Sequence, residues 1–289
     1  METIGKREIR SFLSGQDTPI HATNTQIRHD AGHFVHSYLD LAKKIAELHF
    51  CNPQYVFLFR GQNKDYKNNK KNTSLKPSIL RSKNGGSELP DDALLEKRFL
   101  RLANAEKLLV DNYGQNTNFE GGLKLQRQRV LRWAILQHYE ICDTPLLDIT
   151  QSLHVAGSFA SEKPADQAYI FVLGVPQLNG SLTASAEAGL QIVRLSGICP
   201  PVALRPHIQE GYLLGEYPDM PDFVQKSLYP AYEVDFGRRL IAKFRFNPNT
   251  FWAKSEFFPN IHRSALYPDA DDPLCDIAEK IKSQLPSKD

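Results

Sequence analysis

An arginine at the end of an apolar run is the first residue whose setting suggests chemistry. Arg60 follows the β-branched and aromatic stretch 55–59, and Gly61 comes directly after it. The stretch predicts a buried strand. The guanidinium of Arg60 would then stand at the strand's carboxyl end and present a fixed pair of donors to a phosphate or a carboxylate. An ion pair with a nearby acid explains the same arginine without any ligand.

A second polar cluster opens a helix of small residues. Asp148, Thr150 and Ser152 alternate along an extended segment, which places their side chains on one face. Thr150 or Ser152 would cap the next helix, whose first N–H groups and positive dipole end also favour a bound anion such as a pyrophosphate. Capping alone explains these residues as well. The small side chains of Ala156 and Ala160 predict a helix that packs closely on the neighbouring strand.

Two further polar positions stand at the ends of predicted elements. His138, followed by Tyr139, closes an amphipathic helix, so it could either cap the last carbonyl groups or face a ligand. Gln209 and Glu210 precede Gly211 in a loop that follows a proline-rich stretch. On its own this loop predicts no particular chemistry.

Hydrophobic periodicity predicts the elements that position these residues. We expect helices over 33–50, 91–111, 123–139 and 274–285 and another that begins at Ser152, with strands over 55–59, 146–147, 168–173, 190–195 and 240–246. Because strands and helices do not alternate as in a doubly wound sheet, the order indicates an α+β fold.

The composition excludes several classes of protein. A hydrophobic share of 41% and a charged share of 24% are those of a globular chain with a substantial core. The net charge of +2 is too balanced for a general polyanion binder. The 4 cysteines form no CxxC pair, so neither a metal site nor a disulfide framework is predicted. Lacking a long apolar stretch, the chain is expected to be cytoplasmic and to make no membrane contact.

The expected organisation is a polar N-terminal arm over residues 1–30 and a single domain over 31–289, closed by the C-terminal helix. Within the arm, residues 23–26 are predicted to form an unanchored loop. Residues 63–90 are rich in lysine and asparagine and predict a long surface loop. Its basic residues could steer a polyanion, although a solvated loop is the simpler explanation.

Several short motifs occur in an order that resembles the FRG domain family, named for its Phe-Arg-Gly motif. These are FRGQ at 59–62, LKPSILR at 75–81, QHY at 137–139, TPLLDIT at 144–150, and the paired Val-Ala and Phe-Ala of 155–160. Further on, QEGY at 209–212 and LYPDAD at 266–271 are similar to that family's later motifs. The resemblance covers residues 31–280.

This pattern is in turn similar to that of ADP-ribosyltransferases. The similarity implies helices packed on a small, split, mixed or antiparallel sheet, with NAD as substrate. It also implies transfer of ADP-ribose to a protein or nucleic-acid acceptor, or hydrolysis of NAD, in a protein of bacterial or phage origin. The implied catalytic residues are Arg60, Thr150, Gln209 and Glu210, and the implied ligand-binding residues are Gln62, His138, Tyr139, Asp148 and Ser152.

The implied roles are physically coherent, but two features depart from the transferase pattern. Arg60 would hold a phosphate or ribose of NAD, and Thr150 would brace the nicotinamide ribose or the cleft strand. Glu210 or Asp148 would stabilise the positive charge that builds on the sugar. However, Asp148 and Ile149 replace the usual serine and threonine, and the segment around Glu210 lacks the spaced glutamate.

Three hypotheses therefore remain at the level of sequence. The chain is an enzyme acting on NAD, a non-catalytic module that binds a nucleotide or a partner protein, or a scaffold in which Arg60, His138 and Asp148 satisfy one another. The first requires one cleft that gathers Arg60, Thr150 and Gln209 or Glu210. Polar residues buried from three distant segments favour a site, because burying them as scaffold alone is costly.

Overall fold

The computed structural model describes residues 1–5, 9–82, 89–115, 119, 121–229, 233–255 and 257–286. Its strands are β1 (Ile9–Ser11), β2 (Ile20–Ala22), β3 (His33–Phe34), β4 (Val56–Gln62), β5 (Leu147–Thr150), β6 (Ala168–Val175), β7 (Leu182–Ser185), β8 (Leu190–Arg194), β9 (Gly211–Glu216) and β10 (Leu240–Phe246). Its helices are α1 (Asn24–His29), α2 (Tyr38–Cys51), α3 (Asp92–Gly114), α4 (Gly122–Arg127), α5 (Arg129–His138), α6 (Leu153–Ala160), α7 (Leu204–Ile208), α8 (Phe223–Ser227), α9 (Pro248–Ala253), α10 (Arg263–Leu266) and α11 (Pro273–Gln284). Short 3-10 helices span Ser78–Leu80, Leu195–Gly197, Phe236–Arg239 and Asp269–Asp271.

The main sheet consists of two halves that meet at a single residue pair. Its eight strands run in the order β3-β10-β6-β4-β5-β9-β8-β7. Neighbours are antiparallel except for β3 and β10, which are parallel. Between β4 and β5 the register holds only Phe59 opposite Thr150. The α+β prediction is confirmed, whereas the sheet is large rather than small.

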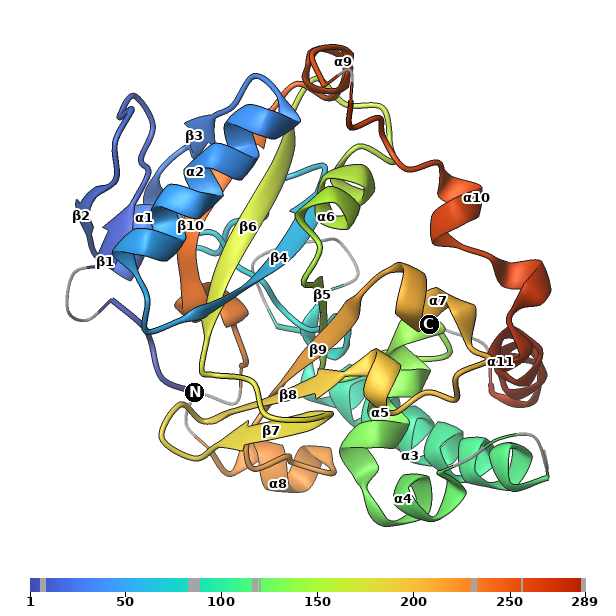
Figure 1. Cartoon of the computed structure of the whole chain (residues 1–289). Helices are drawn as coiled ribbons and strands as arrows, with labels where there is room; N and C mark the ends of the chain where they lie inside the picture. Colours follow the sequence, from blue (N-terminus) through green and yellow to red (C-terminus); the bar gives the residue numbers. More distant parts are fainter. Residues whose placement is uncertain are drawn as a thin grey trace.

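Helices cover the two halves separately, and one helix lies at their join. In Figure 1, α1 and α2 lie beside the half that contains β6 and β10, and α3, α4 and α5 gather beside β8 and β9. Helix α6 contacts β4, β5 and β6. Helix α10 lies at the outer side of the molecule, on the path from α9 to α11 (Figure 1). No helix within the described ranges is both long and apolar enough to cross a membrane.

The join depends on a very close approach of α6 to β4. A Cβ atom at Gly61 would lie 1.8 Å from the carbonyl oxygen of Ala156 and 2.9 Å from the backbone nitrogen of Ala160. Only glycine can occupy this strand position, because no side-chain rotation would relieve a clash with backbone atoms. The predicted close packing of the small-residue helix is therefore confirmed, and it fixes Arg60 relative to the cluster that opens α6.

The predicted helix over 123–139 is two helices with an extended residue between them. Gln128 has φ −116° and ψ 106°, which interrupts the helical path. Nη1 of Arg132 donates to the carbonyl oxygens of Leu125 at 2.8 Å and Gln126 at 2.9 Å, so a side chain satisfies the last turn of α4. The predicted helix over 33–50 likewise begins later, after the short strand β3, with Ser37 as the cap of α2.

Two segments expected at the surface belong in part to the core. The unanchored loop predicted at 23–26 is wrong, because Thr23 caps α1 through a capping box and Ile27 is buried. Within 63–90, Leu75 and Ile79 are buried, and Nζ of the buried Lys243 donates to Oδ2 of Asp65 at 2.7 Å. The surface-loop prediction thus fails for this inner part, and residues 83–88 lie outside the described residues. A domain boundary at residue 30 stays a prediction.

Candidate functional site

Two adjoining cavities lie at the join of the sheet halves. The first, which we call the basic lobe, encloses about 470 Å³ and is lined by Arg60, Gly61, Gln62, Asn63, Tyr66, Lys67, Ser74, Leu75, Lys76, Arg81, Ser82, Phe159, Glu162 and Lys163. The second, the Asp148 lobe, encloses about 350 Å³ and is lined by Phe59, Arg60, Gly61, Arg81, Gln137, His138, Glu140, Asp148, Ile149, Thr150, Phe159, Glu162, Gln209, Gly211 and Tyr267. Arg60, Gly61, Arg81, Phe159 and Glu162 line both lobes, which therefore form one cleft.

Arg60 stands between the lobes with one donor engaged and another free. Its Nη1 donates to the carbonyl oxygen of Asp148, whereas its buried Nε has no hydrogen-bond partner among the described residues. Burial, and then the nearby charge of Arg81, lower the pKa of Arg60 to about 10, partly offset by Asp148. The guanidinium therefore remains charged at neutral pH, and its Nε is left without a hydrogen-bond partner among the described residues.

The carboxylate of Asp148 is held by a chain of hydrogen bonds. Oδ2 accepts from Nε2 of Gln137 at 2.6 Å. The amide oxygen of Gln137 accepts in turn from Oγ1 of Thr144 at 2.7 Å and from Oγ of Ser78 at 3.1 Å, which fixes the orientation of the amide. Burial raises the pKa of Asp148, and the positive charge of Arg60 opposes this shift. An acid is thus fixed in position against the arginine.

Thr150 and Gln209 both line the Asp148 lobe, but their polar groups bind the protein backbone. Oγ1 of Thr150 donates to the carbonyl oxygen of Gln209 at 2.7 Å and accepts from the backbone N–H of Ser152 at 3.0 Å. Nε2 of Gln209 donates to the carbonyl oxygen of Leu266 at 2.8 Å. The predicted gathering of Arg60, Thr150 and Gln209 is present, and the last two hold neighbouring segments in place.

His138 faces the Asp148 lobe as a neutral ring. Burial, and then the charge of Arg205, lower its pKa to about 3, and its buried Nε2 has no partner within the described part of the chain. Gly211 leaves room for this ring, because a Cβ there would lie 3.4 Å from Cε1 of His138. Among the described residues, the His138 ring makes no hydrogen bond to the last carbonyl groups of α5, and Nη1 of Arg205 donates to the His138 carbonyl oxygen at 3.2 Å.

Tyr267 forms another wall of the Asp148 lobe, and Arg205 holds its ring in place. The guanidinium of Arg205 lies between the rings of Tyr139 and Tyr267, 5.2 and 5.0 Å from their centroids. Asp269 pairs with Arg205 from the segment that follows Tyr267. The LYPDAD motif therefore contributes a ring to the cleft and an acid that holds the supporting arginine.

Three of the predicted site residues do not line either lobe. Glu210 is exposed, with φ +44°, and its charge acts on Tyr38, whose pKa is raised first by burial and then by that charge. Ser152 is the N-cap of α6. The buried hydroxyl of Tyr139 donates to Oδ2 of Asp272 at 2.8 Å. Ser152 and Tyr139 thus support the fold, and the Glu210 carboxylate lies away from the cleft.

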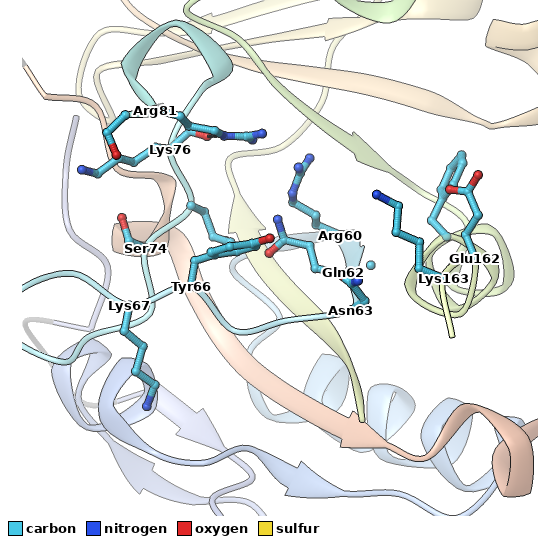
Figure 2. Close-up of a pocket in the computed structure, with 14 residues that line it drawn as sticks. Arg60, Gln62, Asn63, Tyr66, Lys67, Ser74, Lys76, Arg81, Glu162 and Lys163 are labelled. Atoms are coloured by element: carbon cyan, nitrogen blue, oxygen red, sulfur yellow. Dashed lines mark hydrogen bonds between the residues drawn. The ribbon is translucent and has the colours of Figure 1, made fainter. Parts of the chain in front are cut away.

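The basic lobe presents three positive groups to one space. Figure 2 shows the guanidinium of Arg81 and Nζ of Lys163 directed toward Arg60, while the ends of Lys67 and Lys76 point away. Arg60, Arg81 and Lys163 form no ion pair with any carboxylate of the described residues. This arrangement suits an anion with several negatively charged oxygens.

Uncharged groups complete the basic lobe. Oε1 of Gln62 and Oγ of Ser74 are buried and have no hydrogen-bond partner among the described residues. The ring of Tyr66 lies beside Gln62 (Figure 2) and is 43% exposed, which leaves a face available for stacking. The basic lobe thus combines positive groups with unpaired polar atoms and an aromatic ring.

Sequence patterns missed several lining residues. Arg81 lies inside the LKPSILR motif, yet the surrounding lysines suggested a solvated loop. Tyr267 lies inside a recognised motif without a predicted role. Glu140 directly follows the QHY motif and lines the Asp148 lobe, and no spacing rule points to it. In the described ranges, no three His, Cys, Asp or Glu side chains gather in a way that could hold a metal ion.

One family model matches part of the chain. The FRG domain model matches residues 55–168, from the start of β4 to the start of β6. Searches of curated proteins and of solved structures gave no match. The matched segment contains Arg60, Arg81, His138, Glu140 and Asp148, so most of the polar groups of the cleft lie within the part of the chain that is similar to an FRG domain.

Proposed function

We propose that the cleft binds NAD and supports cleavage of the bond between its nicotinamide and ribose. ADP-ribose then passes to a protein or nucleic-acid acceptor, or to water. The observation that carries the proposal is the position of Arg60 between two lobes, with a free donor at Nε and with Asp148, Thr150 and Gln209 around one of them.

The shape and charge of the cleft suit a dinucleotide. Each lobe falls in the range of about 300–1,000 Å³ that is typical of ligand sites. Arg60 and Arg81 line both lobes, which is where a pyrophosphate that joins two nucleosides would lie. Guanidinium groups bind phosphate oxygens through paired hydrogen bonds. The basic lobe with Tyr66 then accommodates the adenosine half, and the Asp148 lobe accommodates the nicotinamide half.

The polar groups of the Asp148 lobe suit the chemistry of glycosidic cleavage. Positive charge develops on the ribose as the bond breaks, and oriented acceptors or carboxylates in a site with little water lower the barrier. Buried polar groups without a partner disfavour a purely structural network, because such a network would satisfy its own members. Nε of Arg60 and Nε2 of His138 are both such groups.

The proposal is tested by incubating the full chain with NAD labelled in its adenosine half, together with protein and nucleic-acid acceptors. Released nicotinamide and transferred label are measured separately. We expect Arg60→Gln to abolish both signals, and Lys70→Gln, in the exposed part of the same basic tract, to leave them unchanged. Circular dichroism checks that each variant is folded. Undiminished nicotinamide release in folded Arg60→Gln protein would contradict the proposal.

A second candidate function is a module that binds the nucleotide without cleaving it. The exposed Glu210 favours this alternative, because its carboxylate does not line the cleft. Calorimetric binding of both NAD and ADP-ribose, with no nicotinamide released over hours, would identify the binding module. Slow but steady release that scales with protein concentration would exclude it.

A further inference from the structure

A carboxylate occupies the position after α5 where helices favour glycine. The backbone N–H of Glu140 donates to the carbonyl oxygen of Gln137 at 3.0 Å, and that of Ile141 donates to Leu136 at 2.9 Å. These two bonds define a Schellman motif, whose central residue adopts left-handed backbone angles. Glu140 has φ +53°. Glycine meets this requirement without steric cost, and glutamate does not.

The charge of Glu140 adds a second cost at the same position. The carboxyl end of a helix carries a partial negative charge, which disfavours a nearby carboxylate. No ion pair or hydrogen bond to the Glu140 carboxylate occurs within the ranges that the structure describes. Both the strained backbone and the charge lower the stability of the fold, so stability does not explain why glutamate occupies this position. Strained residues of this kind gather at functional sites.

The side chain of Glu140 faces the proposed reaction space. It lines the Asp148 lobe together with Tyr267 and His138. Burial is the main cause that raises the pKa values of Asp148 and Tyr267, and the negative charge of Glu140 is a further cause for both. The Glu140 carboxylate therefore lies near both side chains. Glu140 is nevertheless exposed, so a ligand in the lobe can reach it.

The other two acids considered for catalysis are less suitable. Asp148 is half-buried, and its carboxylate already accepts a hydrogen bond from Gln137. Glu210 does not line the lobe. Asp148, Glu140 and Glu162 are the acids among the described residues that line the lobe. Glu162 pairs with Arg263, so Glu140 is the one whose carboxylate makes no hydrogen bond or ion pair with the described part of the protein.

We infer that Glu140 is the catalytic carboxylate for cleavage of the nicotinamide–ribose bond, an inference that rests on the proposed function. As the bond breaks, its electron pair leaves with the nicotinamide nitrogen, and the ribose carbon and ring oxygen share the positive charge. The Glu140 carboxylate stabilises this charge. It then accepts a proton from the water or acceptor group whose oxygen or nitrogen bonds to the ribose carbon. With water, the products are nicotinamide, ADP-ribose and one proton.

The test compares Glu140→Gln and Glu140→Gly with the matched control Glu210→Gln, which also removes a charge from a residue with positive φ. Nicotinamide release from NAD and calorimetric binding of ADP-ribose are measured on each full-length protein. We expect Glu140→Gln to lower the release rate about 100-fold or more and to change the affinity for ADP-ribose by less than about twofold. Glu210→Gln should release nicotinamide at the wild-type rate.

The glycine variant separates catalysis from stability. Because Gly relieves the left-handed strain and removes the charge, Glu140→Gly should melt at a higher temperature than the wild type while losing nicotinamide release. A wild-type rate in folded Glu140→Gln protein would overturn the assignment and leave NAD cleavage intact. A wild-type protein that binds no NAD and releases no nicotinamide would instead contradict the proposed function, and the role of Glu140 with it.

Discussion

The two lobes of the cleft are built in different ways, although Arg60 belongs to both. The basic lobe takes most of its lining from one stretch of chain, residues 60–82, and from the end of α6. The Asp148 lobe draws side chains from β4, α5, β5, the turn before β9 and the segment after α10. Positive side chains directed at a common space dominate the first lobe (Figure 2), whereas carboxylates, a neutral histidine and hydrogen-bonded polar groups line the second.

This difference separates binding from chemistry. Phosphate recognition needs converging positive groups and tolerates some freedom in their positions. Bond cleavage needs groups held in place before the substrate arrives. The hydrogen-bonded Asp148, Gln137 and Thr144 supply such fixed positions in one lobe. The exposed Lys163 and Tyr66 supply adaptable contacts in the other.

The most severe change breaks the join between the lobes. Gly61→Ala would place a Cβ atom 1.8 Å from the carbonyl oxygen of Ala156. Since backbone atoms cannot rotate away, we expect a loss of at least about 4 kcal/mol in the free energy of unfolding. Chemical denaturation measures this loss. Gly114→Ala is the control, because no atom lies within 4 Å of the added Cβ; equal stability of the two variants would show that α6 is not held against β4.

The next change tests the neutral histidine of the Asp148 lobe. The pKa of His138 falls from its ordinary value of 6.5 to about 3 in the folded chain. As the pH falls, the unfolded chain therefore binds the proton on this histidine before the folded chain does. The free energy of unfolding then decreases between about pH 6.5 and pH 3, by up to a few kcal/mol. His138→Gln should flatten this part of the curve of unfolding free energy against pH. The exposed His207→Gln should not, and identical curves for all three proteins would refute a buried neutral ring.

A smaller effect is expected in the basic lobe. Arg81→Gln removes one of the positive groups directed at Arg60, so the affinity for ADP-ribose should fall about tenfold, or about 1.4 kcal/mol. Nicotinamide release at saturating NAD should change much less. A variant that bound normally but reacted slowly would assign Arg81 to catalysis and blur the distinction between the lobes. Calorimetry and steady-state kinetics on the same sample decide between these results.

The smallest expected effect concerns the charge of Asp148. Burial raises its pKa above the ordinary carboxyl value, so the unfolded chain releases the proton at lower pH than the folded chain. The free energy of unfolding then falls as the pH rises from the ordinary carboxyl pKa to the raised pKa. Asp148→Asn should remove this loss and keep the hydrogen bond from Gln137. Exposed Asp111→Asn serves as the control; a loss that persists in Asp148→Asn would assign it to another group.

The predictions from sequence succeeded where local patterns decide the outcome. The helix after Ser152 and the strand 240–246 follow directly from caps and apolar runs, and so does the strand predicted over 55–59, although it continues through Arg60 to Gln62. The broken helix at Gln128 was not predictable, because it depends on a side chain of the next helix that satisfies free carbonyl groups. The lobes themselves depend on long-range register, which no local pattern encodes.

The site predictions show the same limit at the level of single residues. Arg60, Asp148, Thr150, Gln209, His138 and Gln62 line the cleft as expected from motif order. Glu210 was expected in the cleft beside Gln209, but its side chain lies outside the cleft. Its backbone is left-handed. Glu140 has a similar backbone, and its carboxylate faces the cleft. A backbone angle of this kind cannot be inferred from residue type, since glycine is the usual occupant.

A crystal structure of the full chain with bound ADP-ribose tests most directly whether both lobes hold one dinucleotide. We expect the pyrophosphate to lie between the two lobes, with an oxygen within hydrogen-bond distance of the Arg60 guanidinium, and the adenosine half to occupy the basic lobe. The ribose carbon of ADP-ribose that carries nicotinamide in NAD would then face the Glu140 carboxylate. ADP-ribose bound elsewhere on the molecule, or a pyrophosphate out of contact with Arg60, would show that the two lobes do not hold one dinucleotide.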